Sequence, residues 1–380
     1  MLTPQSPLYY HPIRFQQTRP FARRIAGCTA RHPGLLSKSE FVMIQKKFTS
    51  EYANEIITIG RDNRPATTDK MMEEMNALGN YINFLNNGRN IFSFSAGLME
   101  MFRHTDVGDI SLAQVPLVYE NFYLSFGAQP DLELYPGAFV DGAYIAVRRD
   151  EKISVYLTTV NHQCQYYGNS WIFLPEQHYY LEFDISGDKT VETSFREAFK
   201  NELAGLKESD KSFDDVIAEA QSIGIPMRHG NATERKEANI YGGFPVFIKS
   251  LNLIINSILY LGYHKREVLR RHMASAPAGL LGKIEHEEIP KKKRRHNTEL
   301  ELLGYYPISF CGDSVATKDN NNTMREMPAH WRRGHWRNQP FGPGRTDRML
   351  RWIYPTIVRA DKGSPENGHI YKTTTGGSEE

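Results

Sequence analysis

The chain has 380 residues, of which 40% are hydrophobic and 24% charged, and this composition excludes a disordered or fibrous protein. Its three cysteines lie far apart and form no C-x-x-C pair, so we predict neither a disulfide framework nor a metal site, and we expect no cofactor. The net charge of +2 hides an asymmetry, because three short basic segments carry +5 each and leave about −13 on the rest of the chain.

The basic segments are residues 1–42, 291–295 and 328–351. Basic residues that cluster in short segments of an otherwise acidic chain are typical of a surface that contacts phosphate. Tails and loops that merely accumulate solvated Lys and Arg give the same pattern. For the first two segments this second interpretation is the simpler one.

Residues 1–42 are rich in Pro, Arg and Gln and show no sustained hydrophobic period, which predicts a disordered basic extension. The first residues lack the basic start, apolar middle and small-residue cleavage site of a secretory signal. We therefore expect a cytoplasmic protein, and we assign residues 43–274 to an α+β body.

The first well-patterned segment of this body starts near Asp69. Its apolar residues recur at alternating steps of four and three, which predicts a helix that ends at Asn86–Gly88. The members of this stripe are Met71, Met75, Leu78, Ile82 and Leu85. The segment Phe92–Phe102 is predicted to form a second, short helix.

The next hundred residues are rich in β-branched and aromatic side chains between breakers, which predicts strands. These strands are expected at 122–126, 138–148, 153–160, 170–174 and 179–185. The second and third of them are separated by four polar residues and indicate a hairpin. The fold class is therefore expected to be α+β, with a central, largely antiparallel sheet, packed helices and a C-terminal β-hairpin.

Residues Phe244–Leu261 form the longest apolar stretch, but they include Lys249, Asn252 and Asn256. Such polar groups are costly in lipid, so we interpret the stretch as the central buried helix and expect no membrane partner. Residues 275–298 contain Pro, Gly and the Lys291–Arg295 run, which predicts an exposed basic loop. Residues 299–362 are expected to form an Arg/His/Trp hairpin region that packs on the body, and residues 363–380 a tail.

The chemistry-bearing part of the sequence lies in this hairpin region. Residues 330–337 contain two Trp, two His and three Arg. In a strand, alternation places Arg333, His335 and Arg337 on one face and His330, Arg332 and Trp336 on the other. A Gly342-Pro343-Gly344 turn then returns the chain so that residues 352–358 pair with this strand.

The first face suits phosphodiester chemistry. His335 can serve as an acid or a base near neutral pH, while Arg333 and Arg337 can hold a phosphate and neutralise its developing charge. These three are the candidate catalytic residues of a metal-independent ribonuclease. Candidate nucleic-acid-binding residues are His330, Trp331, Arg332, Trp336, Arg345, Lys292 and Arg294, because guanidinium and aromatic planes suit single strands.

Other interpretations of the segment remain open. The same groups can hold a pyrophosphate, as in a nucleotide-dependent transferase, or bind nucleic acid without catalysis. An Arg-rich strand can also serve only to pair with an acidic body, with Arg and Trp stacked on each other. No P-loop, G-x-G-x-x-G, G-x-S-x-G or H-E-x-x-H motif occurs to decide between enzyme classes.

Two parts of the sequence resemble a group of known proteins, and this resemblance indicates the biological setting of the chain. The run Arg333-Gly-His-Trp-Arg337, the Gly-Pro-Gly-Arg345 loop and Trp352-Ile-x-Pro355 resemble the C-terminal signature of uncharacterised proteins carried by bacteria, phages and plasmids. The earlier residues Phe94–Leu98, Phe102, Thr105-Asp106, Asp109-Ile110, Pro116 and Tyr119 resemble the same group. The resemblance covers most of residues 90–358 and implies a mobile-element or defence setting, without an activity.

Taken together, the leading hypothesis is a toxin-like, RNA-directed enzyme of a mobile element or defence system that cleaves phosphodiesters without metal at an Arg/His cleft. The first alternative is a non-catalytic nucleic-acid-binding or regulatory module. The second is a nucleotide-dependent transferase or a protein-interaction module. The expected partners are RNA or a nucleotide, together with an antitoxin or regulatory protein.

Overall fold

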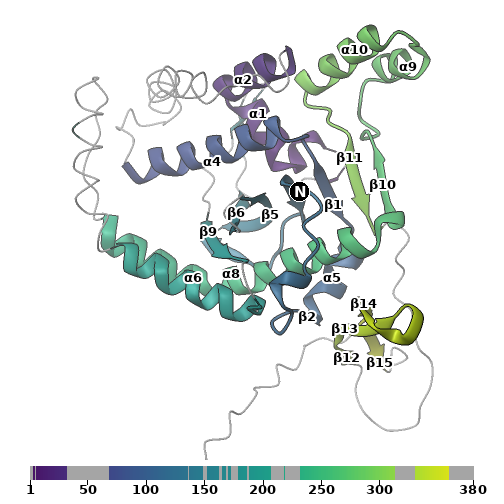
Figure 1. Ribbon diagram of the computed structural model, residues 1–380. Helices are drawn as coiled ribbons and strands as arrows, with labels where there is room; N and C mark the ends of the chain where they lie inside the picture. Colours follow the sequence, from purple (N-terminus) through teal and green to yellow (C-terminus); the bar gives the residue numbers. More distant parts are fainter. Residues whose placement is uncertain are drawn as a thin grey trace, which may run out of the picture.

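A computed structural model describes residues 3–31, 68–206, 218, 232–312 and 330–358, apart from gaps at 5, 136, 149–151, 162–164, 168–169, 173–178 and 186–187. The expected tail at 363–380 and the end of the N-terminal segment, 32–42, lie outside these residues. The chain is α+β, as expected, with one mixed sheet at its centre (Figure 1). In spatial order this sheet contains β10 (Val268–Arg271), β11 (Ile308–Cys311), β1 (Ile91–Phe94), β3 (Asn121–Ser125), β5 (Ala138–Val147), β6 (Lys152–Asn161) and β9 (Tyr179–Asp184), and β4 (Glu133–Tyr135) pairs with β5.

Among the described strands the sheet is largely antiparallel: β1 pairs in parallel with β3 and with β11, and the other pairs are antiparallel. The expected hairpin is confirmed as β5 and β6, which are long strands of β-branched and aromatic residues. Its register shifts between Val140 and Gly142, so Asp141 is the extra residue of a β-bulge.

Helices cover both faces of the sheet (Figure 1). Alternate strand residues point to two separate cores, so that Leu124 and Ile145 belong to one and Tyr123 and Tyr144 to the other. The first core is covered by α5 (Ala96–Arg103), α6 (Val191–Leu206) and α8 (Ala232–Tyr263), and the second by α1 (His11–Thr18), α2 (Pro20–Arg31) and α4 (Thr68–Asn86). The helix predicted from the Met-rich stripe is α4, in which Leu78, Ile82 and Leu85 are buried.

Helix α8 contains the long apolar stretch. It is long and apolar enough at Gly243–Tyr263 to cross a membrane, but two-thirds of that window is buried inside the protein. Phe247, Ile254 and Leu259 are fully buried in the core. The prediction of a central buried helix is confirmed.

The prediction of a disordered extension at 1–42 was wrong for the part that the structure describes. The short helix η1 (Pro7–Tyr9), α1 and α2 pack on the sheet and bury Tyr10, Ile13, Phe15 and Phe21. These helices are short and basic, so their pattern carries little signal, and contacts with distant strands stabilise them.

Two further predictions of local structure need correction. The segment 275–298 is not a loop, because α9 (Ala278–His286) and α10 (Pro290–Leu302) occupy most of it. Pro277 and Pro290 stand at helix starts, where the missing N–H costs nothing, and do not act as breakers. The predicted helix at 92–102 is strand β1 followed by α5, and the Ser95 hydroxyl accepts from the Leu98 N–H to begin that helix.

The C-terminal hairpin is present. It consists of β13 (Gly334–Phe341) and β14 (Asp347–Ile353), and β2 (Thr105–Asp106) pairs with β13 in parallel. The remaining short elements are β12 (His330–Arg332) with β15 (Thr356–Val358), β7 (Gln165–Tyr167) with β8 (Ser170–Ile172), η2 (Leu112–Gln114), η3 (Lys265–Glu267) and η4 (Pro343–Arg345).

Candidate functional site

The inner face of the C-terminal hairpin is a tryptophan pair. Trp336 of β13 and Trp352 of β14 are register partners, and their rings stack with centroids 5.7 Å apart and planes 12° from parallel. Only 8% of Trp336 and 3% of Trp352 is exposed. The two indoles therefore attach the hairpin to the body instead of presenting a face to a ligand.

Both indole N–H groups find acceptors on the body. Trp336 Nε1 donates to Asn256 Oδ1 of α8 at 2.8 Å, and Trp352 Nε1 donates to Thr105 Oγ1 of β2 at 3.2 Å. Asn256 Nδ2 in turn donates to the Thr105 carbonyl at 3.0 Å, and Asn252 Nδ2 donates to the same carbonyl at 2.9 Å. The polar residues that interrupt the apolar helix α8 thus fix the hairpin and the end of α5 to it.

A second contact joins the start of β13 to the body. The Gly334 N–H donates to the His104 carbonyl at 2.9 Å, and the His104 ring stacks on Trp331 with centroids 4.5 Å apart. His104 Nε2 lies 3.1 Å from Glu100 Oε1. This hydrogen bond, together with Arg103, lowers the pKa of the Glu100 carboxyl to about 2, against the opposing effect of burial.

The outer face of the hairpin is basic. His335, Arg337 and Arg351 are exposed, and Arg337 and Arg351 are register partners across the two strands. Directly opposed like charges destabilise a strand pair, unless an anion lies between them. Within the described part of the chain, neither guanidinium forms an ion pair.

The rest of this face adds two apolar side chains and a turn. Phe341 is 44% exposed and Met349 is 40% exposed, and both lie on the Arg337 side by strand alternation. The turn that joins the strands has φ of 79° at Gly342, 72° at Gly344 and 58° at Arg345. Its glycines permit that path, and Arg345 stands exposed at the tip. We call His335, Arg337, Phe341, Arg345, Met349 and Arg351 the hairpin outer face.

The structure separates the residues singled out from the sequence. His335 and Arg337 share the hairpin outer face, whereas Arg333 and Arg332 are exposed just before β13, where β12 ends. Trp331 is half-buried on His104, and the surroundings of the His330 side chain lie outside the described residues. Lys292 and Arg294 lie on α10, at the opposite end of the molecule (Figure 1). The sequence analysis did not identify Arg351. Pairing the two strands across the predicted turn would have placed it opposite Arg337, on the same outward face of the hairpin.

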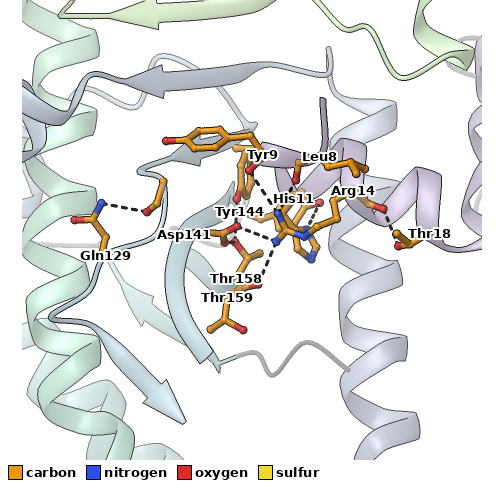
Figure 2. A network of polar contacts seen from close by, with 12 residues as sticks. Leu8, Tyr9, His11, Arg14, Thr18, Gln129, Asp141, Tyr144, Thr158 and Thr159 are labelled. Atoms are coloured by element: carbon orange, nitrogen blue, oxygen red, sulfur yellow. Dashed lines mark hydrogen bonds and ion pairs between the residues drawn. The ribbon is translucent and has the colours of Figure 1, made fainter. Parts of the chain in front are cut away.

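A second polar cluster lies in the core (Figure 2). Arg14 Nη2 lies 2.8 Å from Asp141 Oδ2, and the Thr158 hydroxyl donates to Asp141 Oδ1 at 2.6 Å. Arg14 also donates to the carbonyls of Thr159 and Leu8, while His11 Nδ1 lies 3.1 Å from the Tyr144 hydroxyl. Arg14 is 0% and Asp141 is 2% exposed, so this cluster is structural and out of reach of a substrate.

Comparison with known proteins shows that a family model matches most of the chain, including the C-terminal hairpin. Residues 92–360 match the family model described as AcrVA2-like, anti-CRISPR type V subtype A2. A solved structure described as the crystal structure of AcrVA2 is similar at 11% identity and a TM-score of 0.33, over 91% of this chain and 97% of that chain. No curated protein matches.

Proposed function

Because this chain belongs to the AcrVA2-like, anti-CRISPR type V subtype A2 family, we propose that it protects a mobile element from a type V-A defence system, the Cas12a system. The mobile-element and defence setting expected from the C-terminal signature agrees with that family. The protein would then act in the cytoplasm of the bacterial host, where such a system operates.

The hairpin outer face is the proposed contact surface, and its ligand is the phosphate backbone of a single-stranded RNA of the defence system. The observation that carries the proposal is the opposed, exposed pair Arg337 and Arg351. Two guanidiniums held side by side on a rigid hairpin can share one phosphate through charge-assisted hydrogen bonds. Phe341 and Met349 supply apolar contacts for an unstacked base.

We propose binding and not cleavage. A metal-independent ribonuclease needs one group to take a proton and another to give one. Among the described residues, the register partner of His335 on β2 is Asp106, but the Asp106 Oδ1 accepts from the Gly108 N–H at 3.0 Å and no described contact joins it to His335, while the carboxylate of Asp347 lies opposite Phe341, at the far end of the strands. The leading hypothesis of an RNA-cleaving toxin, and the antitoxin that it implied, therefore give way to the first alternative, a non-catalytic nucleic-acid-binding module.

The direct test is fluorescence anisotropy with a labelled single-stranded RNA across a salt series. The double variant Arg337→Glu, Arg351→Glu should weaken binding and reduce the slope of log K against log salt by about 0.7 per lost phosphate contact. The matched control reverses two exposed charges elsewhere, Lys200→Glu and Lys249→Glu, and should leave the slope unchanged. Equal binding by both variants would remove the hairpin outer face from the proposal.

A second experiment separates binding from catalysis and connects both to defence. Cells that carry a type V-A system are challenged with a targeted phage while they express wild type, His335→Ala or the Arg337→Glu, Arg351→Glu variant. Rescue of the phage should survive His335→Ala and fail in the arginine variant. Cleavage of total RNA by the purified protein that persists with a chelator and disappears in His335→Ala would instead restore the ribonuclease hypothesis.

A further inference from the structure

The outward side of the C-terminal hairpin continues onto a third strand. β2 pairs with β13 in parallel, and Asp106 is the register partner of His335 (Figure 1). The preceding residue, Thr105, points inward, because its side chain is buried and accepts from the Trp352 indole N–H. Strand alternation therefore turns Asp106 outward, on the same side as His335, and both residues are exposed.

Asp106 places a carboxylate beside cations. Arg337 stands two residues beyond His335 on β13, a distance of about 7 Å along an extended strand, and Arg351 is its register partner. Within the described residues Asp106 forms no ion pair, and its Oδ1 accepts from the Gly108 N–H at 3.0 Å. A carboxylate accepts about four hydrogen bonds, so both of its oxygens keep capacity for a ligand. Since it repels phosphate, that ligand must also present hydrogen-bond donors.

A nucleotide combines the two kinds of group. Its phosphate is an anion, and its base has polar edges that are open to recognition when the strand is single. The Watson–Crick edge of guanine presents two adjacent donors, N1–H and the N2 amino group, which match the two oxygens of a carboxylate. Adenine and cytosine present one amino group beside an acceptor nitrogen, and uracil presents one N–H between two carbonyl oxygens. A carboxylate at this place therefore favours guanine.

The His335 ring supplies a surface for the base. Histidine is one of the side chains on which the unstacked bases of single-stranded RNA stack. Neighbouring strands of a sheet lie about 4.8 Å apart, so a base that lies on the His335 ring can direct its edge at the Asp106 carboxylate on the next strand. The arginine pair lies further along the same face, where it can hold the phosphate.

We infer that Asp106 recognises a guanine base of the single-stranded RNA whose phosphate contacts Arg337 and Arg351, with the base stacked on His335. The inference rests on the proposed function, because it adds a base-recognising group to the same RNA site. Phosphate contacts position a strand without selecting its sequence, whereas contacts with base edges select it. Asp106 thereby gives the site its sequence preference.

The test measures binding of the full chain to labelled oligouridines that carry guanosine, adenosine, cytidine, uridine or inosine at one central position. Wild type should bind the guanosine probe at least about fivefold more tightly than the uridine probe, which is the lower end of the discrimination expected of a bidentate contact. Inosine lacks the N2 amino group of guanosine and should lose part of this preference. The inosine comparison uses wild type alone, so it does not depend on the folding of a variant.

A pair of matched variants assigns the preference to one carboxylate. Asp106→Asn removes the charge and keeps an oxygen that can accept from the Gly108 N–H, and it should bind the guanosine and uridine probes equally. Its affinity for the uridine probe should not fall, since a charge that repels phosphate has been removed. Asp109→Asn removes another exposed carboxylate of the same loop and should keep the full preference for guanosine.

The outcomes separate this inference from the proposed function. Salt-dependent binding of the uridine probe that weakens in the Arg337→Glu, Arg351→Glu variant supports the proposed function by itself. With that binding present, the inference is overturned if wild type binds guanosine and uridine probes equally, if the preference survives Asp106→Asn, or if Asp109→Asn abolishes it as well. Absence of RNA binding, or binding that the arginine variant leaves unchanged, overturns the proposed function and this inference with it.

Discussion

Arg14 in α1 and Asp141 at the bulge of β5 form an ion pair in the protein core, 2.8 Å apart in space and 127 positions apart in the chain. The bulge turns Asp141 toward α1, and the Thr158 hydroxyl satisfies its second oxygen. The pair thereby fixes the N-terminal helices to the central sheet.

Removing one partner of this pair should therefore be costly. Arg14→Met leaves a buried carboxylate without its cation and should lower the free energy of unfolding by about 3–5 kcal/mol. The double variant Arg14→Met, Asp141→Leu should be less destabilised than the sum of the two single variants. Urea denaturation measures both, and Arg196→Met, which breaks an exposed pair with Glu192, is the control at about 1 kcal/mol or less. Strict additivity would mean that the two residues do not interact.

The same pair explains why the N-terminal segment was not predictable. Helix α4 and the β5–β6 hairpin follow from local periods of 3.6 and 2, which the sequence displays directly. The burial of Arg14 depends on a carboxylate more than a hundred positions away, and no local pattern contains it. Helix α10 was missed for a different reason, since Pro290 and the Lys291–Arg295 run were interpreted as loop signals although Lys and Arg are good helix formers and Pro290 stands at the first helical position.

The hairpin was predictable in part. Alternation correctly placed His335 and Arg337 on one face and Trp336 on the other. Which face is buried depends on Asn256 and Thr105, and these belong to elements that sequence periodicity does not bring together. Arg332 falls on a separate strand because β12 pairs with β15 and not with β14.

The tryptophan contact with α8 can be measured by a double-variant cycle. Asn256→Leu leaves the Trp336 indole N–H buried without an acceptor and should cost about 1–3 kcal/mol. Trp336→Phe leaves Asn256 Oδ1 without its donor, and the combined variant should recover part of the sum because neither unpaired group remains. Denaturation gives the coupling energy, and limited proteolysis reports release of the hairpin. A coupling energy near zero would show that the hydrogen bond does not hold the hairpin.

The Glu100 carboxyl should make the free energy of unfolding depend on pH in the acidic range. Its pKa is lowered from 4.5 to about 2, chiefly by the hydrogen bond with His104. A lowered pKa in the folded state contributes stability that is complete above about pH 4.5 and is lost as the pH falls toward 2. The difference in unfolding free energy between wild type and Glu100→Gln should therefore shrink between these pH values. A constant difference across that window would show that Glu100 is not perturbed.

Gly334 should be required for the hairpin to approach the body. A Cβ at this position would stand 2.6 Å from Thr105 Oγ1 and 2.8 Å from the Pro355 backbone nitrogen. The Thr105 side chain is fixed by its bond to the Met101 carbonyl, and the proline backbone cannot move without shifting β14, so neither neighbour can yield. Gly334→Ala should therefore destabilise the protein by about 1–3 kcal/mol and increase cleavage of the hairpin by protease.

Gly279 in α9 provides the matched control for that substitution. Nothing lies within 4 Å of a Cβ built there. Since the alanine loses less backbone freedom on folding and meets no neighbour, Gly279→Ala should be stabilising by about 0.4–1 kcal/mol. Opposite signs for the two alanines, measured by the same denaturation experiment, separate the packing constraint at Gly334 from the general effect of replacing glycine. If Gly334→Ala were as harmless as Gly279→Ala, β13 would not be packed against β2 as closely as the structure has it, and the tryptophan contacts alone would hold the hairpin.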